Sequence, residues 1–392
     1  MENKERKLTH IVGTFLIQAA GAFLNGAGLD SGEDKNAVIP KTFRDGTKRV
    51  PYVSSQAWRR WLRETFKDEY PDQPATELKA TQKNAKGNAA KIGTEMDPVK
   101  FPEDDIFGYM RAEKGQGRAA KSEDVDEPEE DAEFELDGEA ESSPVKTKKK
   151  AEKVQAVMRP SPFSASILKS LRNDGWQGED EGFVHLKEGS PLPYKTKFYN
   201  TQLQGVFGLA YSRLGVFRNE GDRIELDAEF LKKYLADGTM QRHPEYSDRE
   251  IYEVKNNQRL ARATMILRSL AVLRGGAKQA QFGTDVAPKV IILAGLNCGN
   301  LIFNDLFEER EGQPAIKLAA LKQIIADYLT RLTTTVFIGV RDGYLHPENE
   351  KELKAWVTDG AKLDDSSTTH DIRLSSPVKA VEYLTDALKE VG

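Results

Sequence analysis

The sequence has few of the residues that build disulfides, metal sites and nucleophilic catalytic centres. Its single cysteine, Cys298, excludes an intrachain disulfide framework and suits a reducing cytoplasm. Nothing marks a general base near Cys298, so we expect a small buried residue rather than a nucleophile. The five histidines are far apart, and no CxxC or HxxxH spacing occurs. We therefore expect no metal, no cofactor and no enzymatic activity.

Phosphate-binding motifs and membrane-spanning runs are also lacking. The glycines at 26, 28 and 32 do not fit G-x-G-x-x-G, because the third required position is Ser31, and no Walker pattern occurs. No apolar run is long enough to cross a membrane. Residues 11–24 loosely resemble a signal peptide, but Thr14 and Gln18 interrupt the apolar run, which favours a buried strand. We expect a cytoplasmic protein.

The charge that the sequence does contain is unevenly distributed. Residues 35–63 hold eight Lys and Arg residues and one acid, in a chain with a formal net charge of −5. Residues 123–141 hold twelve acids and no base, and without them the net charge would be +7. The net negative charge of the chain thus comes from residues 123–141, while residues 35–63 form a cationic segment. Such a segment predicts a polyanion as partner.

The apolar pattern predicts a mixture of strands and helices. Strand patterns occur at residues 8–18, 198–217, 289–296 and 335–340, and helical patterns at 54–66, 256–273, 315–332 and from 375 onward. Without regular βαβ alternation, this favours the α+β class, a sheet with helices on one face. Residues 25–32 are expected to form a glycine-rich loop. Residues 69–155 have few periodic apolar positions, which predicts an insertion with a disordered centre near 115–152.

The helix at residues 54–66 has two chemically distinct sides. Ser54 or Ser55 supplies the N-cap. Apolar residues at helical spacing, with Trp58 and Trp61 among them, should face the core. Arginines and a lysine should line another side, where single-stranded nucleic acid is a suitable partner. The members of this predicted basic side are Arg59, Arg60, Arg63 and Lys67.

A second basic stripe is expected on the helix at 256–273 and just after it. It comprises Lys255, Arg259, Arg262, Arg274 and Lys278. Gly275 and Gly276 could present backbone N–H groups to a phosphate, although a helix-terminating turn explains them equally well. A solvated surface is the ordinary interpretation of such stripes. Interleaved aromatic and amide groups, including Phe43, Tyr52 and Gln56, favour nucleic acid instead.

Residues 51–65, PYVSSQAWRRWLRET, resemble a motif of the DevR-type CRISPR-associated proteins. These form the repeated backbone subunit of type I effector complexes (Cascade), especially type I-B. Residues 11–32 and 199–217 are similar too, as is the turn at 274–276 that leads to Pro288. The resemblance implies an RRM-like (ferredoxin-like) palm sheet from residues 1–68 and 156–392. It also implies a finger insertion at 69–155 and a thumb loop within about 160–200.

The resemblance further implies a function. Copies of the chain would stack along one CRISPR RNA and grip its backbone, the guide would pair with target DNA, and other Cascade subunits would join. Base pairing reads sequence in such complexes, so the protein needs no catalytic constellation. On this view the RNA-binding residues are Lys41, Arg44, Lys48, Arg49, Ser54, Ser55, Gln56, Arg59, Arg60, Arg63, Arg274, Gly275, Gly276 and Lys278.

Two alternative functions remain open at the level of the sequence. A sequence-specific DNA-binding regulator would need a second helix close after residues 54–66, joined by a helix-turn-helix turn, and none is evident. An endoribonuclease that processes the CRISPR transcript would need a general acid or base, typically His, near the basic groove. Neither residues 35–63 nor residues 255–279 contain a histidine.

Overall fold

The computed structural model describes residues 7–30, 37–77, 79–83, 89–111, 156–175, 178–184, 187–255, 258–363 and 368–391. The expected disordered centre near 115–152, the acidic run and Lys35 lie outside these residues. Strands and helices mix without regular alternation, which confirms the α+β class.

The main sheet is built around a long central strand. Its order is β22-β21-β18-β1-β13-β11-β5-β4, and β1 pairs antiparallel with both β13 and β18. The bounds of these strands are β1 His10–Ala22, β4 Thr42–Asp45, β5 Lys48–Val53, β11 Leu168–Ser170, β13 Leu192–Leu209, β18 Val290–Leu296, β21 Val336–Val340 and β22 Ile372–Ser375. The short β10 (Phe163–Ala165) also pairs with β13. The strand predictions at 8–18, 289–296 and 335–340 are confirmed.

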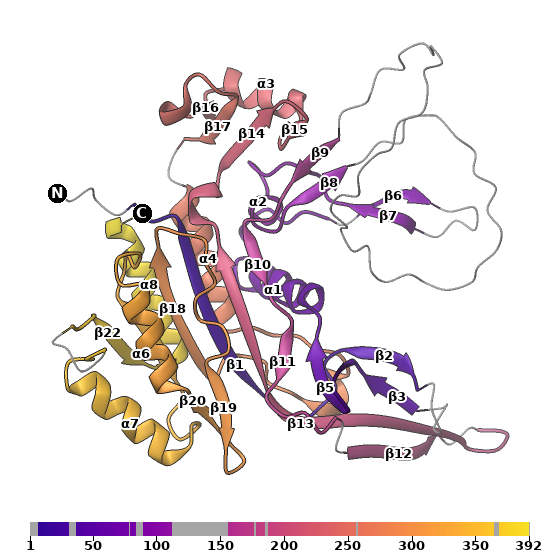
Figure 1. Ribbon diagram of the computed structural model, residues 1–392. Helices are drawn as coiled ribbons and strands as arrows, with labels where there is room; N and C mark the ends of the chain where they lie inside the picture. Colours follow the sequence, from indigo (N-terminus) through magenta and orange to yellow (C-terminus); the bar gives the residue numbers. More distant parts are fainter. Residues whose placement is uncertain are drawn as a thin grey trace, which may run out of the picture.

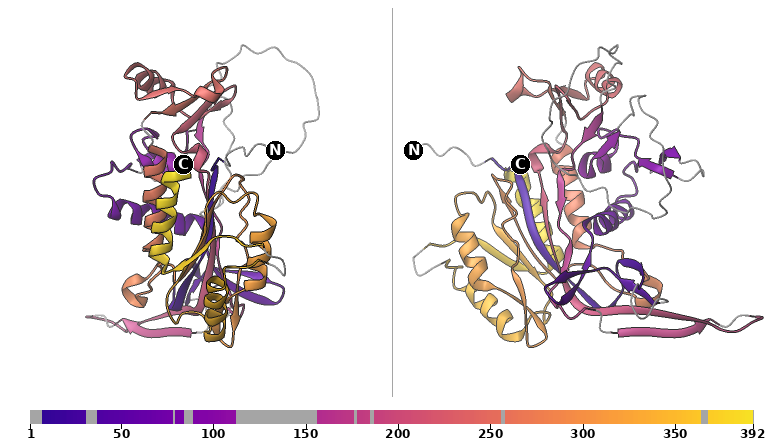
Figure 2. Two further views of the ribbon diagram at one scale, coloured as in Figure 1. Left: turned by 90° about the vertical axis from the view of Figure 1, so that its left-hand side faces the viewer. Right: turned by 45° about the vertical axis from the view of Figure 1, so that its right-hand side comes forward.

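Helices cover the main sheet on both faces, so the expectation of helices on one face is wrong. Alternate residues of β1 enter two separate cores: Phe15 packs in one and Leu16 in the other. Both faces of β18 are likewise buried, which explains its continuous apolar run. One face carries α1 (Ser55–Glu69), α4 (Gln258–Ala271) and α8 (Pro377–Val391), and the other carries α6 (Leu318–Asp327) and α7 (Pro347–Thr358) (Figure 2).

The predicted helices are confirmed with changed ends. Ser54 caps α1, and its Oγ accepts a hydrogen bond from the backbone N of Ala57 at 3.3 Å. The helix expected at 315–332 is shorter, because residues 313–316 pair in a hairpin, β19 (Phe307–Arg310) with β20 (Gln313–Ile316). The strand expected at 198–217 is split by the 3-10 turn η1 (Tyr211–Arg213). The pattern missed α7.

A second sheet, with the order β16-β17-β14-β15-β9-β8, forms a separate layer at the top of Figure 1. Its strands are β8 Tyr109–Arg111, β9 Val157–Arg159, β14 Val216–Glu220, β15 Arg223–Ile224, β16 Met240–Arg242 and β17 Ile251–Val254. The helix α3 (Ala228–Ala236) packs on it through a small core that includes Phe217 and Tyr234. Only β8 comes from the expected insertion. Residues 216–254, which lie outside it, supply β14, β15, β16 and β17.

A buried ionic cluster joins the second sheet to the helices behind the main sheet. Asp105, on α2 (Pro102–Phe107), pairs with Arg159 of β9 and with Arg262 of α4. Its carboxylate also accepts a hydrogen bond from the backbone N of Gly215 at 2.9 Å. Arg159 Nη1 reaches Glu225 at 3.1 Å. One carboxylate thus ties together three segments that are far apart in the sequence.

A long hairpin projects from one end of the main sheet (Figure 1). It consists of β12 (Gly178–Val184) and the first half of β13. Large apolar side chains on it are exposed, with Phe183 at 65% and Tyr194 at 43%. The hairpin lies within the range predicted for the thumb, and its assignment as a thumb stays a prediction.

Short elements complete the described part of the chain. At the base of the hairpin, β3 (Ala37–Pro40) pairs with β13 and with β2 (Gly26–Leu29). The expected glycine-rich loop at 25–32 therefore contains a short strand. The others are β6 (Lys79–Lys83) and β7 (Ala89–Gly93), which pair with each other, η2 (Pro244–Tyr246) and α5 (Gln279–Phe282).

Candidate nucleic-acid interface

The β4–β5 hairpin forms a cationic edge of the main sheet. Arg44 pairs with Arg49 across the two strands, and both side chains are exposed. Lys48 is also exposed, and its Nζ lies 3.3 Å from Oδ1 of Asn173. Lys41 lies just before β4, and its backbone N donates a hydrogen bond to the carbonyl oxygen of Asn25 at 2.8 Å. The hairpin therefore presents three exposed cations at the sheet edge.

The start of α1 lies beside the loop that follows β1. The backbone N of Ser54 donates to Oδ1 of Asn25 at 3.0 Å, which ties the helix cap to this loop. Ser55 is half-buried, Gln56 and Arg60 are exposed, and the first turn of α1 has no acid. The N-terminus of a helix carries partial positive charge and free N–H groups, so this turn favours an anion.

Two arginines of α1 do not lie on a solvent-facing side as the sequence suggested. Arg59 Nη2 donates to the carbonyl oxygen of Phe107 at 3.1 Å and to Ser161 Oγ at 3.0 Å. Burial, and then the charge of Arg63, lower the pKa of Arg59. Arg63 Nε donates to Oε1 of the fully buried Glu103 at 2.9 Å. Both arginines therefore bind α2 and its surroundings, and Arg60 is the exposed arginine of the three.

The expected second stripe is also divided by the fold. Arg262 is 2% exposed and pairs with Asp105, so its expected place in a surface stripe is wrong. Arg259 donates from Nε to the carbonyl oxygen of Leu214 at 3.3 Å, and its guanidinium lies 5.7 Å from the centroid of the Tyr211 ring. α4 therefore directs Arg259 and Arg262 toward the junction with the second sheet.

The turn after α4 packs between α1 and the end of β1. Gly275 and Gly276 have φ values of +141° and +106°, a region that glycine adopts readily. A Cβ on Gly275 would clash with the Trp61 ring, and one on Gly276 would clash with Leu24. Close packing of the turn thus accounts for both glycines. Whether their backbone also binds phosphate stays a prediction.

The cations of this turn point in two directions. Arg274 Nη2 pairs with Glu69 at the end of α1, at 2.6 Å. Lys278 Nζ lies 2.6 Å from Thr196 Oγ1 and 5.1 Å from the centroid of the Phe23 ring. Lys278 therefore belongs with the base of the projecting hairpin, and Arg274 is bound to an acid.

Sequence reasoning missed Lys169, a cation of the same region. It lies on β11 beside the cationic hairpin, and its Nζ is 6.0 Å from the centroid of the Phe43 ring. Phe43 and Tyr52 form an edge-to-face pair with centroids 5.9 Å apart. No pattern marks the three-residue β11 as a strand, so nothing in the sequence placed Lys169 next to these rings.

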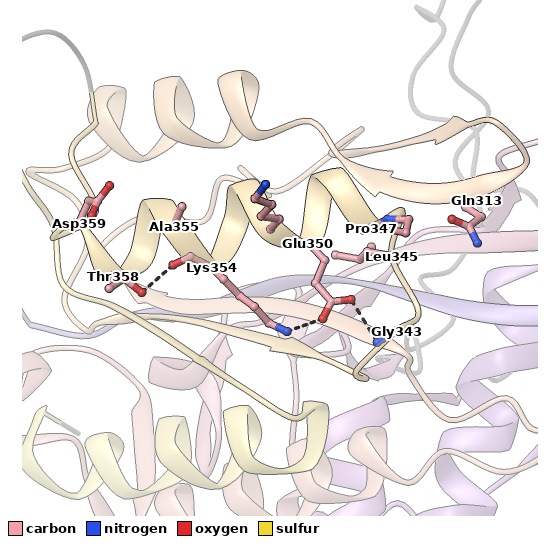
Figure 3. Close-up of a pocket in the computed structure, with 10 residues that line it drawn as sticks. Gln313, Gly343, Leu345, Pro347, Glu350, Lys354, Ala355, Thr358 and Asp359 are labelled. Carbon is pink, nitrogen blue, oxygen red and sulfur yellow. Dashed lines mark hydrogen bonds and ion pairs between the residues drawn. The ribbon is translucent and has the colours of Figure 1, made fainter.

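A cavity of about 610 Å³ lies along α7, outside this region (Figure 3). Two of its charged groups bind each other: Lys354 Nζ is 2.5 Å from Glu350 Oε1, and Glu350 Oε2 also accepts from the backbone N of Gly343 at 3.1 Å. None of the predicted RNA-binding residues lines it. The cavity therefore carries no evident chemistry of its own.

Among the described residues, no group of three or more His, Cys, Asp or Glu side chains is arranged to hold a metal ion. No helix in the described part of the chain combines the length and apolarity that crossing a membrane requires.

Comparison with solved structures gives a likeness in fold. A chain described as "CRISPR RNA-guided surveillance complex, pre-nicking" has a TM-score of 0.50 and 9% sequence identity, covering 97% of this chain and 100% of that chain. A chain of a "CRISPR RNA-guided surveillance complex" has a TM-score of 0.46 and 10% identity over the same shares. No protein-family model and no curated protein matches the chain. At 9% identity, the first likeness shows a shared fold.

Proposed function

We propose that this chain is the RNA-binding backbone subunit of a type I, I-B-like CRISPR surveillance complex (Cascade). The observation that carries the proposal is the likeness in fold to a chain of an RNA-guided surveillance complex, which covers nearly the full length of both chains. Several copies would bind along one guide RNA with other subunits of the complex, and the guide would pair with target DNA. Sequence is then read by base pairing, and the protein supplies backbone contacts and shape.

The RNA backbone binds at the cationic hairpin and the start of α1. Arg44, Lys48 and Arg49 are exposed at one edge, and Ser54, whose backbone N donates to Asn25, caps only the N–H of Ala57 in the first turn of α1. Guanidinium groups and helix N-termini both bind phosphate well. Arg60 completes this surface. Arg59 and Arg63, which the sequence placed with it, position α1 through α2 instead.

The projecting hairpin acts as the thumb. Its exposed Phe183, Val184 and Tyr194 offer flat and apolar surfaces at the end of a rigid two-stranded arm. Such side chains can contact unstacked bases. In this role the hairpin interrupts the guide–target duplex at intervals, and the second sheet with the insertion serves as the fingers.

Co-purification tests the proposal directly. The chain is expressed with and without a CRISPR transcript, purified, and its bound nucleic acid is sized and sequenced. We expect single-stranded RNA that carries several copies of the chain, remains uncut, and dissociates steeply with rising salt. Cleavage of the transcript by the purified chain supports the endoribonuclease alternative. Preference for a palindromic duplex supports the regulator. Either outcome overturns the proposal.

A further inference from the structure

One face of the main sheet carries two rows of side chains that the proposed function does not use. Strand register aligns Leu16, Gln204, Lys169 and Tyr52 in the first row, across β1, β13, β11 and β5. In the second row, Gln18 pairs with Gln202 on β1 and β13, and Phe43 pairs with Val50 on β4 and β5. Residues two apart on a strand share a face, so both rows lie on the same side of the sheet.

This side is the one that carries α6 and α7, but these helices lie elsewhere. Figure 1 shows both on the β18–β22 side of β1, away from β11 and β5. Gln18 and Lys169 are exposed, and Tyr52 and Phe43 are half-buried. Among the described residues, therefore, no helix covers this part of the sheet. Gln202 is half-buried, and Gln204 is only 8% exposed. We name the face lined by Gln18, Phe43, Tyr52, Lys169, Gln202 and Gln204 the amide face.

The amide face combines stacking surfaces with hydrogen-bonding groups. The rings of Phe43 and Tyr52 meet edge to face, and the Lys169 ammonium approaches Phe43 at 6.0 Å. Gln202 Oε1 is buried and has no hydrogen-bond partner among the described residues. An unpaired buried acceptor is costly, so the Gln202 amide gains by turning toward a donor that reaches this face.

Charge indicates which partner fits. Lys169 is the charged member of the amide face. Asp45, two residues from Phe43 and on the same side of the hairpin, lies opposite Lys48 in the β4–β5 pair, so these two charges offset each other. Protein interface cores are depleted in lysine, whereas nucleobases use aromatic rings for stacking and amides for hydrogen bonds to their edges. We propose that the amide face binds unpaired bases of single-stranded RNA, with at least one base stacked on Phe43 or Tyr52.

This inference rests on the proposed function in one respect. The RNA backbone must follow the β4–β5 hairpin at the edge of the sheet, where Arg44 and Arg49 lie on the face opposite to the amide face. The phosphate contacts of Arg44 and Arg49 are then separate from the base contacts of Tyr52, because in the two-residue repeat of β4 and β5 these arginines alternate with Phe43 and Tyr52. Base binding and phosphate binding can therefore be changed independently.

The test compares two RNA probes by fluorescence anisotropy with the full chain. One is a labelled 12-nucleotide uridine RNA, and the other is a labelled RNA of equal length that lacks its bases. We expect the wild-type chain to bind the uridine RNA more tightly. Phe43→Leu with Tyr52→Leu should weaken uridine RNA binding by about fivefold to about 150-fold, the range for one stacked base, and leave the abasic probe unchanged.

Two controls make the result interpretable. Tyr52→Phe keeps the ring and should keep the affinity. Melting temperatures establish that the variants fold, and a variant that fails to fold is replaced by Lys169→Ser with Gln204→Ser. Equal affinity of the wild-type chain for both probes, with no effect of the ring substitutions, overturns the amide face alone. Failure of the wild-type chain to bind either probe overturns the proposed function itself.

Discussion

The β4–β5 hairpin and helix α1 are neighbours in sequence and both are rich in arginine, but their charges meet different partners. Arg44 and Arg49 of the hairpin are exposed. Arg59 and Arg63 of α1 turn inward, and Arg63 neutralises Glu103, which is 0% exposed. A cluster of cations in sequence therefore has two possible meanings. Such a cluster can be exposed, or it can neutralise buried acids. The outcome depends on carboxylates that can lie forty residues away in the sequence.

The buried arginines show that a buried charge needs a partner of opposite charge. A buried carboxylate without a partner costs several kcal/mol, so Glu103 and Asp105 each need a cation. α1 and α4 supply Arg63 and Arg262. These contacts fix α2 and the second sheet against the helices, while Arg44, Lys48 and Arg49 of the hairpin are exposed. The following predictions test this division, beginning with the largest effect.

Removing the central carboxylate of the buried cluster should have the largest effect on stability. Asp105→Ala leaves two buried guanidinium groups, those of Arg159 and Arg262, without their common partner. We expect the free energy of unfolding to fall by about 3–5 kcal/mol, as for other broken buried pairs. Urea denaturation measures it. The exposed hairpin acid is the control: Asp45→Ala should change stability by less than about 0.5 kcal/mol. Equal effects of the two substitutions would contradict the division.

The acid next to Glu103 should make stability depend on pH. Burial raises the pKa of Asp104 from its ordinary value to about 6. The folded chain therefore holds a proton that the unfolded chain has lost, and stability falls as pH rises between about 4 and about 6. Relative to wild type, Asp104→Asn should gain about 2–3 kcal/mol between pH 4 and pH 7.5. Urea denaturation at the two pH values tests this, and parallel pH profiles for the two proteins would disprove it.

Two arginines on one helix provide a matched comparison. Arg63→Met removes the Nε–H donor that lies 2.9 Å from Glu103, and should lower the free energy of unfolding by about 1–3 kcal/mol. Arg60→Met, on the exposed side, should change it by less than about 0.5 kcal/mol. Thermal denaturation and urea denaturation both report the difference. If Arg60→Met is the more destabilising of the two, the orientation of α1 described here is incorrect.

The sequence predicted the local features of this region correctly. Ser54 as N-cap and the buried Trp58 follow from side-chain chemistry and helical spacing, which act over a few residues. The strand at 289–296 was recognised by its continuous apolar run. Its burial on both faces, and hence the helices on both sides of the sheet, could have been inferred from the same run, because a strand with one wet face would alternate.

The remaining features depended on contacts between distant segments. The direction of Arg59 is set by Phe107, which lies inside the expected insertion, and by Ser161, which lies just after it. α7 was missed because its sequence is mostly polar and only Asn349, Leu353 and Trp356 are buried. The amide face was missed because glutamine at alternate positions of a strand looks like an ordinary solvent-facing side until register aligns it with Lys169 and Tyr52.

The salt dependence of RNA binding tests the central claim, that the hairpin holds the RNA backbone. The wild-type chain is compared with the combined variant Arg44→Gln, Lys48→Gln and Arg49→Gln, using a uridine RNA over a range of salt concentrations. Each phosphate contact on a single strand contributes about 0.7 to the slope of log affinity against log salt, so the variant should have a slope shallower by about 2. Its melting temperature should match that of wild type. An unchanged slope in a folded variant would contradict the account.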